Sequence, residues 1–197
     1  MAITLIEYNR RLNGVISDLK HGSHGKVMIQ IATEALTLVK KRIQERGENA
    51  EGSKFKPYST TPMLASHKGM TGSAYSKVAG SKQKRKELKW VTIGGHKLFE
   101  LEGGYKEFRQ LHGRQTEFVD FTFSGRMWNN IKLKSSSEDH NSGIAIIGAT
   151  QEEEEKKLEG NTKRKGEIMA LSNKEIKILT HSYEQGILNI WRKNKLL

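Results

Sequence analysis

The apolar positions near the N-terminus follow two helical patterns. Residues 3–20 place apolar side chains roughly on one side of a helix, which predicts a first helix before a Gly/Ser turn. From residue 26 to 46 the pattern is more regular, and Gly47 is positioned to end the second helix behind a cluster of cations. The apolar stripe of this second helix consists of Met28, Ala32, Ala35, Leu36, Val39 and Ile43.

Patterns of period two predict strands further along the chain. The clearest is FVDFTF at 118–123, in which Val119, Phe121 and Phe123 share one face and are expected to line a core. A core position for Phe121 predicts that its replacement by alanine is severely destabilising. Further strands are predicted at 88–93 and 166–171, and a hairpin over 132–148.

Helix-start signals complete the expected fold. Ser124 is expected to cap a short helix, and Thr150 with Glu153 forms a candidate capping box for a helix from Gln151. Ser172 with Glu175 forms a second candidate box, opening an amphipathic C-terminal helix. The element order predicts an α+β fold in which the N-terminal helices and the C-terminal helix pack on a small antiparallel sheet.

Residues 48–89 interrupt these patterns. This segment contains both prolines, many small and basic residues, and few large apolar ones. Such a composition does not readily offset the entropy lost on ordering. We therefore expect a single domain over 1–197 with 48–89 inserted as an extended basic arm, mobile until a partner fixes it and cut first by trypsin between 54 and 89.

Charge gives this arm a candidate function. The formal net charge is +12, and residues 53–97 hold ten Lys/Arg against the single acid Glu87. A solvated, self-repelling segment is one interpretation, and an electrostatic surface for a polyanion such as nucleic acid is the other. The candidate interface or polyanion-binding residues are Lys82, Lys84, Arg85, Lys86 and Lys89, together with Arg109 and Arg114 as forked donors for carboxylates or phosphates.

The sequence offers little for catalysis. The absence of cysteine excludes disulfides, thiol catalysis and thiolate metal sites. His21 and His24 have ligand-like spacing but no nearby acid, and the carboxylates are scattered or gathered at one helix start. We expect no enzymatic activity, no cofactor and no metal. The chain also has no apolar run long enough to span a membrane and no signal-peptide core, so no membrane association is expected.

Three segments together resemble the virion-morphogenesis, or tail-completion, family of long-tailed bacteriophages, including Mu-like phages. They are KFKPYS at 54–59, GYKEFRQLHG at 104–113 and VDFTFSGRM at 119–127. A later segment, EGNTKRKGEIMALSNKEIKIL at 159–179, is similar to the family's ending. The resemblance runs from about residue 27 to 193, and the lysine-rich residues 60–87 depart from the family pattern.

The resemblance implies a structural virion protein that completes the tail or neck and joins head to tail. It further implies a homo-oligomeric ring, such as a hexamer or dodecamer, in contact with neck, tail-terminator or connector proteins and non-specifically with genomic DNA. The location would be the virion, after assembly in the host cytoplasm. The alternative from the residues themselves is a sequence-independent nucleic-acid-binding protein that uses the basic 53–97 segment.

Overall fold

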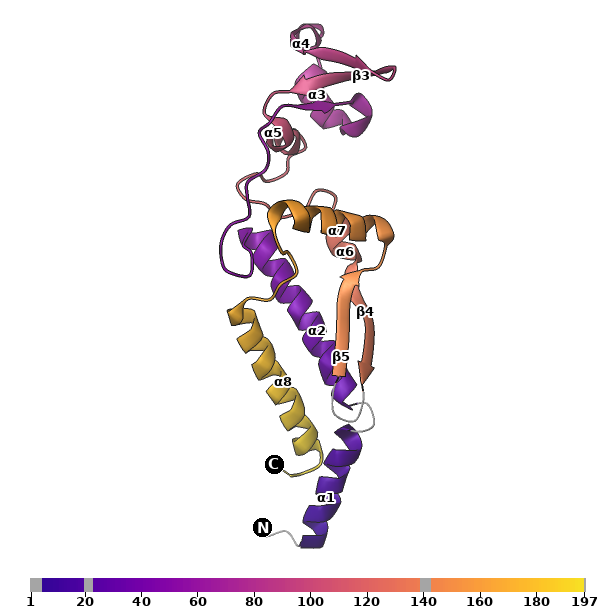
Figure 1. Cartoon of the computed structure of the whole chain (residues 1–197), viewed down its shortest axis with the longest axis vertical. Helices are drawn as coiled ribbons and strands as arrows, with labels where there is room; N and C mark the ends of the chain where they lie inside the picture. Colours follow the sequence, from indigo (N-terminus) through magenta and orange to yellow (C-terminus); the bar gives the residue numbers. More distant parts are fainter. Residues whose placement is uncertain (1–4, 20–22, 139–142, 197) are drawn as a thin grey trace. The chain divides into compact units, whose positions relative to one another are not determined.

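The computed structural model describes residues 5–19, 23–138 and 143–196, and its contacts divide the chain into two compact units (Figure 1). One unit combines Met1–Ser53 with Ser124–Leu197, and we call it the helical unit. The other, Lys54–Phe123, is the inserted unit. Helices and antiparallel strands occur in both, so the predicted α+β class is confirmed.

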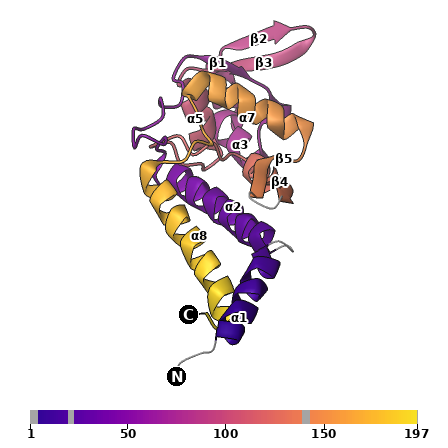
Figure 2. The same cartoon turned by 60° about the horizontal axis from the view of Figure 1, so that its bottom comes forward.

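The helical unit is organised around two long helices. Helix α2 (His24–Lys41) continues as a π-helical turn (Arg42–Arg46), and α8 (Asn173–Lys193) lies alongside α2, as both cartoon views show (Figures 1 and 2). The predicted end of the second helix is confirmed, because Gly47 adopts a left-handed φ of 63° there. Four positions of the predicted apolar stripe are buried, namely Ala32, Ala35, Val39 and Ile43. Met28 and Leu36 are half-buried, and Val27, which the stripe did not include, is buried.

Helix α1 (Leu5–Asp18) is the first predicted helix and packs near the C-terminal end of α8 (Figure 2). Val15, Val27 and Ile190 form a small buried cluster that joins α1, α2 and α8. Only part of the predicted apolar face of α1 is covered, since Ile6 remains 83% exposed.

The predicted hairpin is present in the helical unit and packs against α2. Its strands are β4 (Ile131–Glu138) and β5 (Gly143–Ala149), paired antiparallel with an irregularity between Leu133 and Ser135. The residues at 139–142, where the turn is expected, lie outside the described part. Two helices flank the hairpin in sequence, α6 (Arg126–Asn130) and α7 (Glu152–Lys165).

The helix-start predictions have different outcomes. The Ser172–Glu175 capping box is confirmed in both directions. At α7 the prediction is wrong: the N-cap is Gln151, whose side chain makes no capping bond, and the Thr150 hydroxyl instead donates to the Asn130 carbonyl at 3.1 Å. At α6 the N-cap is Gly125 rather than Ser124.

The strand predicted at 166–171 is absent from this described segment, which is irregular between α7 and α8. Ile168 is nevertheless fully buried. A short apolar run can bury a side chain without a strand partner, and the sequence pattern does not distinguish the two cases.

The inserted unit contains a three-stranded antiparallel sheet in the order β1-β3-β2. Its strands are β1 (Met63–Ala65), β2 (Trp90–Ile93) and β3 (His96–Leu101), and Gly94-Gly95 turn between β2 and β3 with positive φ at both residues. Strand β2 confirms the prediction over 88–93. Helices α3 (Gly72–Ala79), α4 (Lys82–Glu87) and α5 (Gly104–Leu111) complete the unit with a 3₁₀ turn (His67–Gly69).

The expectation of an extended arm at 48–89, inserted in a single domain, needs correction. Most of this segment belongs to the folded inserted unit and supplies β1, α3 and α4. Its small residues contribute to the local core, where Ala65 and Ala74 cluster with the fully buried Phe99 of β3, and Ala79 is buried as well. The small number of large apolar residues led us to underestimate the tendency of this segment to fold. Alanine fits a tightly packed site, and the larger side chains of the core come from β3.

The strand predicted at 118–123 is also absent. Val119 is buried as predicted, but so is its neighbour Asp120, whereas Phe121 and Phe123 are only half-buried. Phe121 also has a φ of 51°, which lies outside the strand region. The side-chain bonds of Asp120 explain the departure, because a carboxylate directed inward breaks the expected alternation of apolar and polar faces.

Candidate polyanion interface

Positive charge is concentrated in the inserted unit. Residues 54–123 contain 13 Lys/Arg and six Asp/Glu, a formal charge of +7 out of the whole chain's +12. Positive charge of this density attracts polyanions when the side chains reach solvent. The environment of each candidate cation therefore determines whether it can serve a binding surface.

Helix α4 presents four of the predicted candidates to solvent: Lys82, Lys84, Arg85 and Lys86. The Ser81 hydroxyl accepts a bond from the Lys84 amide at 3.1 Å and so starts this short helix. The Arg85 Nε donates to the Ala79 carbonyl at 2.9 Å, which anchors the guanidinium beside the end of α3. The structure thus brings the four cations together on one exposed helix.

A surface pocket of about 530 Å³ adjoins α4. It is lined by three cationic side chains and three aromatic ones, and we call it the basic–aromatic pocket. The Trp90 indole N–H donates to the Arg85 carbonyl at 2.7 Å, and the Lys97 ammonium lies 4.7 Å from the Trp90 ring centroid. The lining residues are His67, Tyr75, Arg85, Lys86, Trp90 and Lys97.

Lys89 is exposed but already paired. Its ammonium lies 2.7 Å from Glu102 and 3.6 Å from Glu100. The hydrogen bond with Glu102 raises the pKa of Lys89 and lowers that of the Glu102 carboxyl. Both acids partly neutralise this cation, so Lys89 is a weaker polyanion candidate than the residues of α4.

Arg109 is not a surface donor, and this prediction requires correction. Its side chain is buried, and its guanidinium pairs with Asp120 at 3.1 Å and donates to the carbonyls of Gln115 and Thr122. The guanidinium carbon also lies 4.2 Å from the Tyr58 ring centroid. These partners within the inserted unit occupy the guanidinium donors of Arg109. Arg109 therefore stabilises the fold and does not bind an external ligand.

Tyr58 completes this buried cluster, which we call the Tyr58–Arg109–Asp120 node. Its hydroxyl donates to Asp120 Oδ1 at 2.8 Å and accepts from the Asp120 amide at 3.1 Å. Burial, followed by the bond to Asp120, raises the pKa of Tyr58. The sequence pattern missed the node because it assigned Asp120 to the solvent side of a strand.

Arg114 lies five residues beyond Arg109 in an exposed position. Its guanidinium carbon is 5.9 Å from the Phe123 ring centroid. Arg114 therefore remains an accessible candidate. Of the two predicted arginine donors, Arg109 is therefore buried and Arg114 is exposed to solvent.

The segments 54–59, 104–113 and 119–127 each contribute one residue to the Tyr58–Arg109–Asp120 node. Gly104 makes their close approach possible: its φ is 61°, and a Cβ there would lie 2.2 Å from the Thr61 carbonyl oxygen. The Lys106 amide donates to the Ser59 carbonyl at 3.0 Å, which ties α5 to the 54–59 segment. Two aromatic contacts link the segments further, Phe55 with Phe121 and Phe108 with Phe123.

The helical unit contains its own buried charges. The Arg42 guanidinium pairs with Glu175, whose carboxylate also accepts from the Ser172 amide. Glu154 is buried as well; its Oε1 meets Lys157 at 2.8 Å, while its Oε2 has no hydrogen-bond partner among the described residues. These buried charged groups stabilise the packing of the helices and the first turns of α7 and α8.

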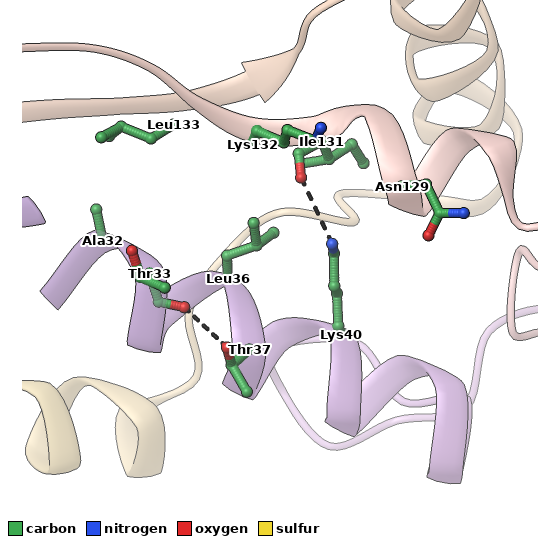
Figure 3. Close-up of a pocket in the computed structure, with 9 residues that line it drawn as sticks. All are labelled: Ala32, Thr33, Leu36, Thr37, Lys40, Asn129, Ile131, Lys132 and Leu133. Carbon is green, nitrogen blue, oxygen red and sulfur yellow. Dashed lines mark hydrogen bonds between the residues drawn. The ribbon is translucent and has the colours of Figure 1, made fainter. Parts of the chain in front are cut away.

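A second cavity, of about 420 Å³, lies within the helical unit between α2 and β4 (Figure 3). Lys40 extends from α2 toward β4 and donates to the Ile131 carbonyl at 3.5 Å (Figure 3). Burial, followed by repulsion from Lys132, lowers the pKa of Lys40. The remaining lining combines apolar side chains with the polar Thr33, Thr37, Asn129 and Lys132.

Of the two histidines with ligand-like spacing, His24 lies within the described residues and His21 lies outside them. His24 Nε2 lies 2.9 Å from the Tyr183 hydroxyl. Across 5–19, 23–138 and 143–196, no group of three or more potential metal-binding side chains occurs. Among the helices in those ranges, none combines the length and apolarity needed to span a bilayer.

Comparison with known proteins yields no match to a family model, a curated protein or a solved structure.

Proposed function

We propose that this protein is a structural virion subunit that completes the tail or neck of a long-tailed bacteriophage and joins head to tail as a homo-oligomeric ring. The proposal starts from the order and spacing of three family-like segments in the sequence. A ring would contact neighbouring neck, tail-terminator or connector proteins through repeated copies of the same surfaces.

The observation that carries this proposal is the convergence of those segments on one buried node. Residues 54–59 are distant in sequence from 104–113 and 119–127, yet the Asp120 carboxylate bonds to both Tyr58 and Arg109 in the inserted unit. Buried motif residues that bond to one another stabilise the fold of the inserted unit and are not available to bind a substrate. This favours a scaffold that presents surfaces to other proteins over a site that transforms a substrate.

Size-exclusion chromatography with light scattering tests the ring directly. We expect the full chain to form a discrete oligomer with one fixed subunit number. A protein that remains monomeric across micromolar concentrations would contradict self-assembly in isolation.

Complementation tests the role in joining. Phage that lack the gene would be supplied with the wild-type chain or with a variant in which Lys82, Lys84, Arg85 and Lys86 are neutral. We expect the variant to leave filled heads beside unjoined or overlong tails in electron micrographs. Joined particles with defective genome replication or packaging would oppose the assembly role.

A second candidate function is sequence-independent nucleic-acid binding. The exposed cations of α4 favour it, since Lys82, Arg85 and Lys86 form no ion pair within the described part of the chain. Cations without internal counter-charges can release counterions from a phosphate backbone. Binding of this kind should weaken steeply as salt rises.

A further inference from the structure

The basic–aromatic pocket combines two kinds of side chain that a purely electrostatic surface does not require. Arg85, Lys86 and Lys97 are exposed at its edge, and none of its lining residues is acidic. Its volume of about 530 Å³ falls within the usual range for small-ligand sites, about 300–1,000 Å³. The space is therefore large enough for a nucleotide unit rather than only an inorganic ion.

The aromatic side chains are held in defined positions. Trp90 is fixed by the bond from its indole N–H to the Arg85 carbonyl and by an edge contact with the buried Phe99 at 5.5 Å. His67 and Tyr75 meet edge to face at 4.4 Å between ring centroids. Aromatic rings that are already ordered lose little entropy when a ligand stacks on them.

The Lys97 ammonium over the Trp90 ring marks where a ligand can enter. This lysine is exposed, and within the described part of the chain its ammonium has no partner other than the Trp90 ring at 4.7 Å. A flexible lysine can move aside to pair with a phosphate and so leave the ring face to a base. The ring and the cation would then contact adjacent parts of one nucleotide.

We propose that the basic–aromatic pocket binds single-stranded nucleic acid, with an unpaired base against Trp90 and the flanking phosphates at Arg85, Lys86 and Lys97. The proposal rests on the second candidate function and specifies its site. Stacking on aromatic side chains together with a basic groove is the usual way to bind single strands without sequence preference. A duplex keeps its base faces stacked internally, and the carboxylate side chains of an acidic protein segment have no aromatic face to stack on Trp90.

The test measures binding of the full chain to a labelled oligothymidine of about 20 nucleotides, by fluorescence anisotropy over a series of salt concentrations. Oligouridine of equal length, a matched duplex and polyglutamate serve as further probes. We expect both single strands to bind more tightly than the duplex or polyglutamate. Tighter binding of oligothymidine than of oligouridine would identify the ligand as single-stranded DNA, and the reverse order would identify it as RNA.

Two charge-matched variants separate the pocket from general electrostatics. The double variant Lys86→Gln/Lys97→Gln should flatten the salt dependence of oligothymidine binding by about 0.7 in slope for each lost phosphate contact. The control Lys163→Gln/Lys177→Gln removes the same charge from exposed positions in the helical unit and should change the slope less.

Substitutions of Trp90 test stacking. Trp90→Leu should weaken oligothymidine binding about 5-fold or more, since stacking on an aromatic side chain commonly contributes at least that factor per base. Trp90→Phe should keep most of the affinity and lose the quenching of tryptophan fluorescence on binding. Circular dichroism checks that each variant is folded. If Trp90→Leu does not fold, the variant Lys86→Gln/Lys97→Gln still tests the proposal.

The outcomes distinguish the pocket from the broader function. Equal binding of duplex and single strand, or equal effects of the two double variants, would overturn the pocket while leaving electrostatic nucleic-acid binding intact. Binding of polyglutamate without any nucleic acid would overturn both and indicate an acidic protein partner.

Discussion

Arg109 and Arg114 have the same side chain five residues apart and different roles. Arg109 is 1% exposed and has bonding partners in three directions, whereas Arg114 is exposed. A buried charge is stable only when its partners replace the lost water. The Asp120 carboxylate and two carbonyls supply that replacement for Arg109.

Replacement of Arg109 by methionine is therefore expected to destabilise the inserted unit by about 3–5 kcal/mol, because Asp120 would lose its buried counter-charge. Lysine should not restore the stability, since it lacks the planar fork that reaches all three partners. Urea unfolding followed by fluorescence and circular dichroism measures both effects. The control Arg114→Met should stay within about 0.5 kcal/mol of wild type, and equal losses at the two positions would contradict the assigned roles.

At the scale of elements, the contact between α2 and α8 depends on a missing side chain. A Cβ at Gly186 of α8 would lie 2.8 Å and 3.1 Å from the two methyl carbons of Val27 on α2. Glycine inside a helix normally costs about 0.5–1 kcal/mol relative to alanine. At this position it permits close packing of the two helices.

Gly186→Ala is expected to destabilise the helical unit by about 1–3 kcal/mol, because overpacking outweighs the better helix propensity of alanine. Gly160→Ala in α7 is the matched control. The nearest described atom to a Cβ at Gly160 is a terminal nitrogen of Arg164 at 3.8 Å, so alanine should stabilise the protein by about 0.5–1 kcal/mol. Urea midpoints measure both, and stabilisation by Gly186→Ala would indicate that the helices have room to spare.

At the scale of the whole molecule, the basic segment is largely folded, which changes the expected course of proteolysis. Helix α3 buries Ala74 and Ala79, whereas the six-residue α4 has no buried residue. Local opening requires less free energy where few apolar contacts are lost. Cleavage sites within 54–89 should therefore differ in their susceptibility.

Limited trypsinolysis of the native protein should cut within Lys82–Glu87 before it cuts after Lys68 or Lys77. Intact-mass spectrometry at early times identifies the first fragments, and digestion in urea provides the control in which all sites are accessible. Early cleavage after Lys68 or Lys77 would indicate that α3 opens as readily as α4. Uniform cleavage over 54–89 would restore the extended-arm interpretation.

The sequence by itself determined the features that depend on near neighbours. The periodicity of α2, the left-handed end at Gly47 and the capping box of Ser172 with Glu175 all involve residues within a few positions of each other. The hairpin strands β4 and β5 were predicted for the same reason. Such features follow from backbone geometry and short-range bonding, which a linear pattern records directly.

Only the tertiary structure determined that Arg109 and Asp120 are buried and that most of the basic segment is folded. Tyr58 and Asp120 are bonded although 62 positions separate them, and this contact turns inward a carboxylate that the alternating pattern assigned to solvent. In the same way, the small residues before α4 become a core only when Phe99 of β3 packs against them. Burial and charge pairing depend on which distant segments meet, and that information is not contained in the local order of residues.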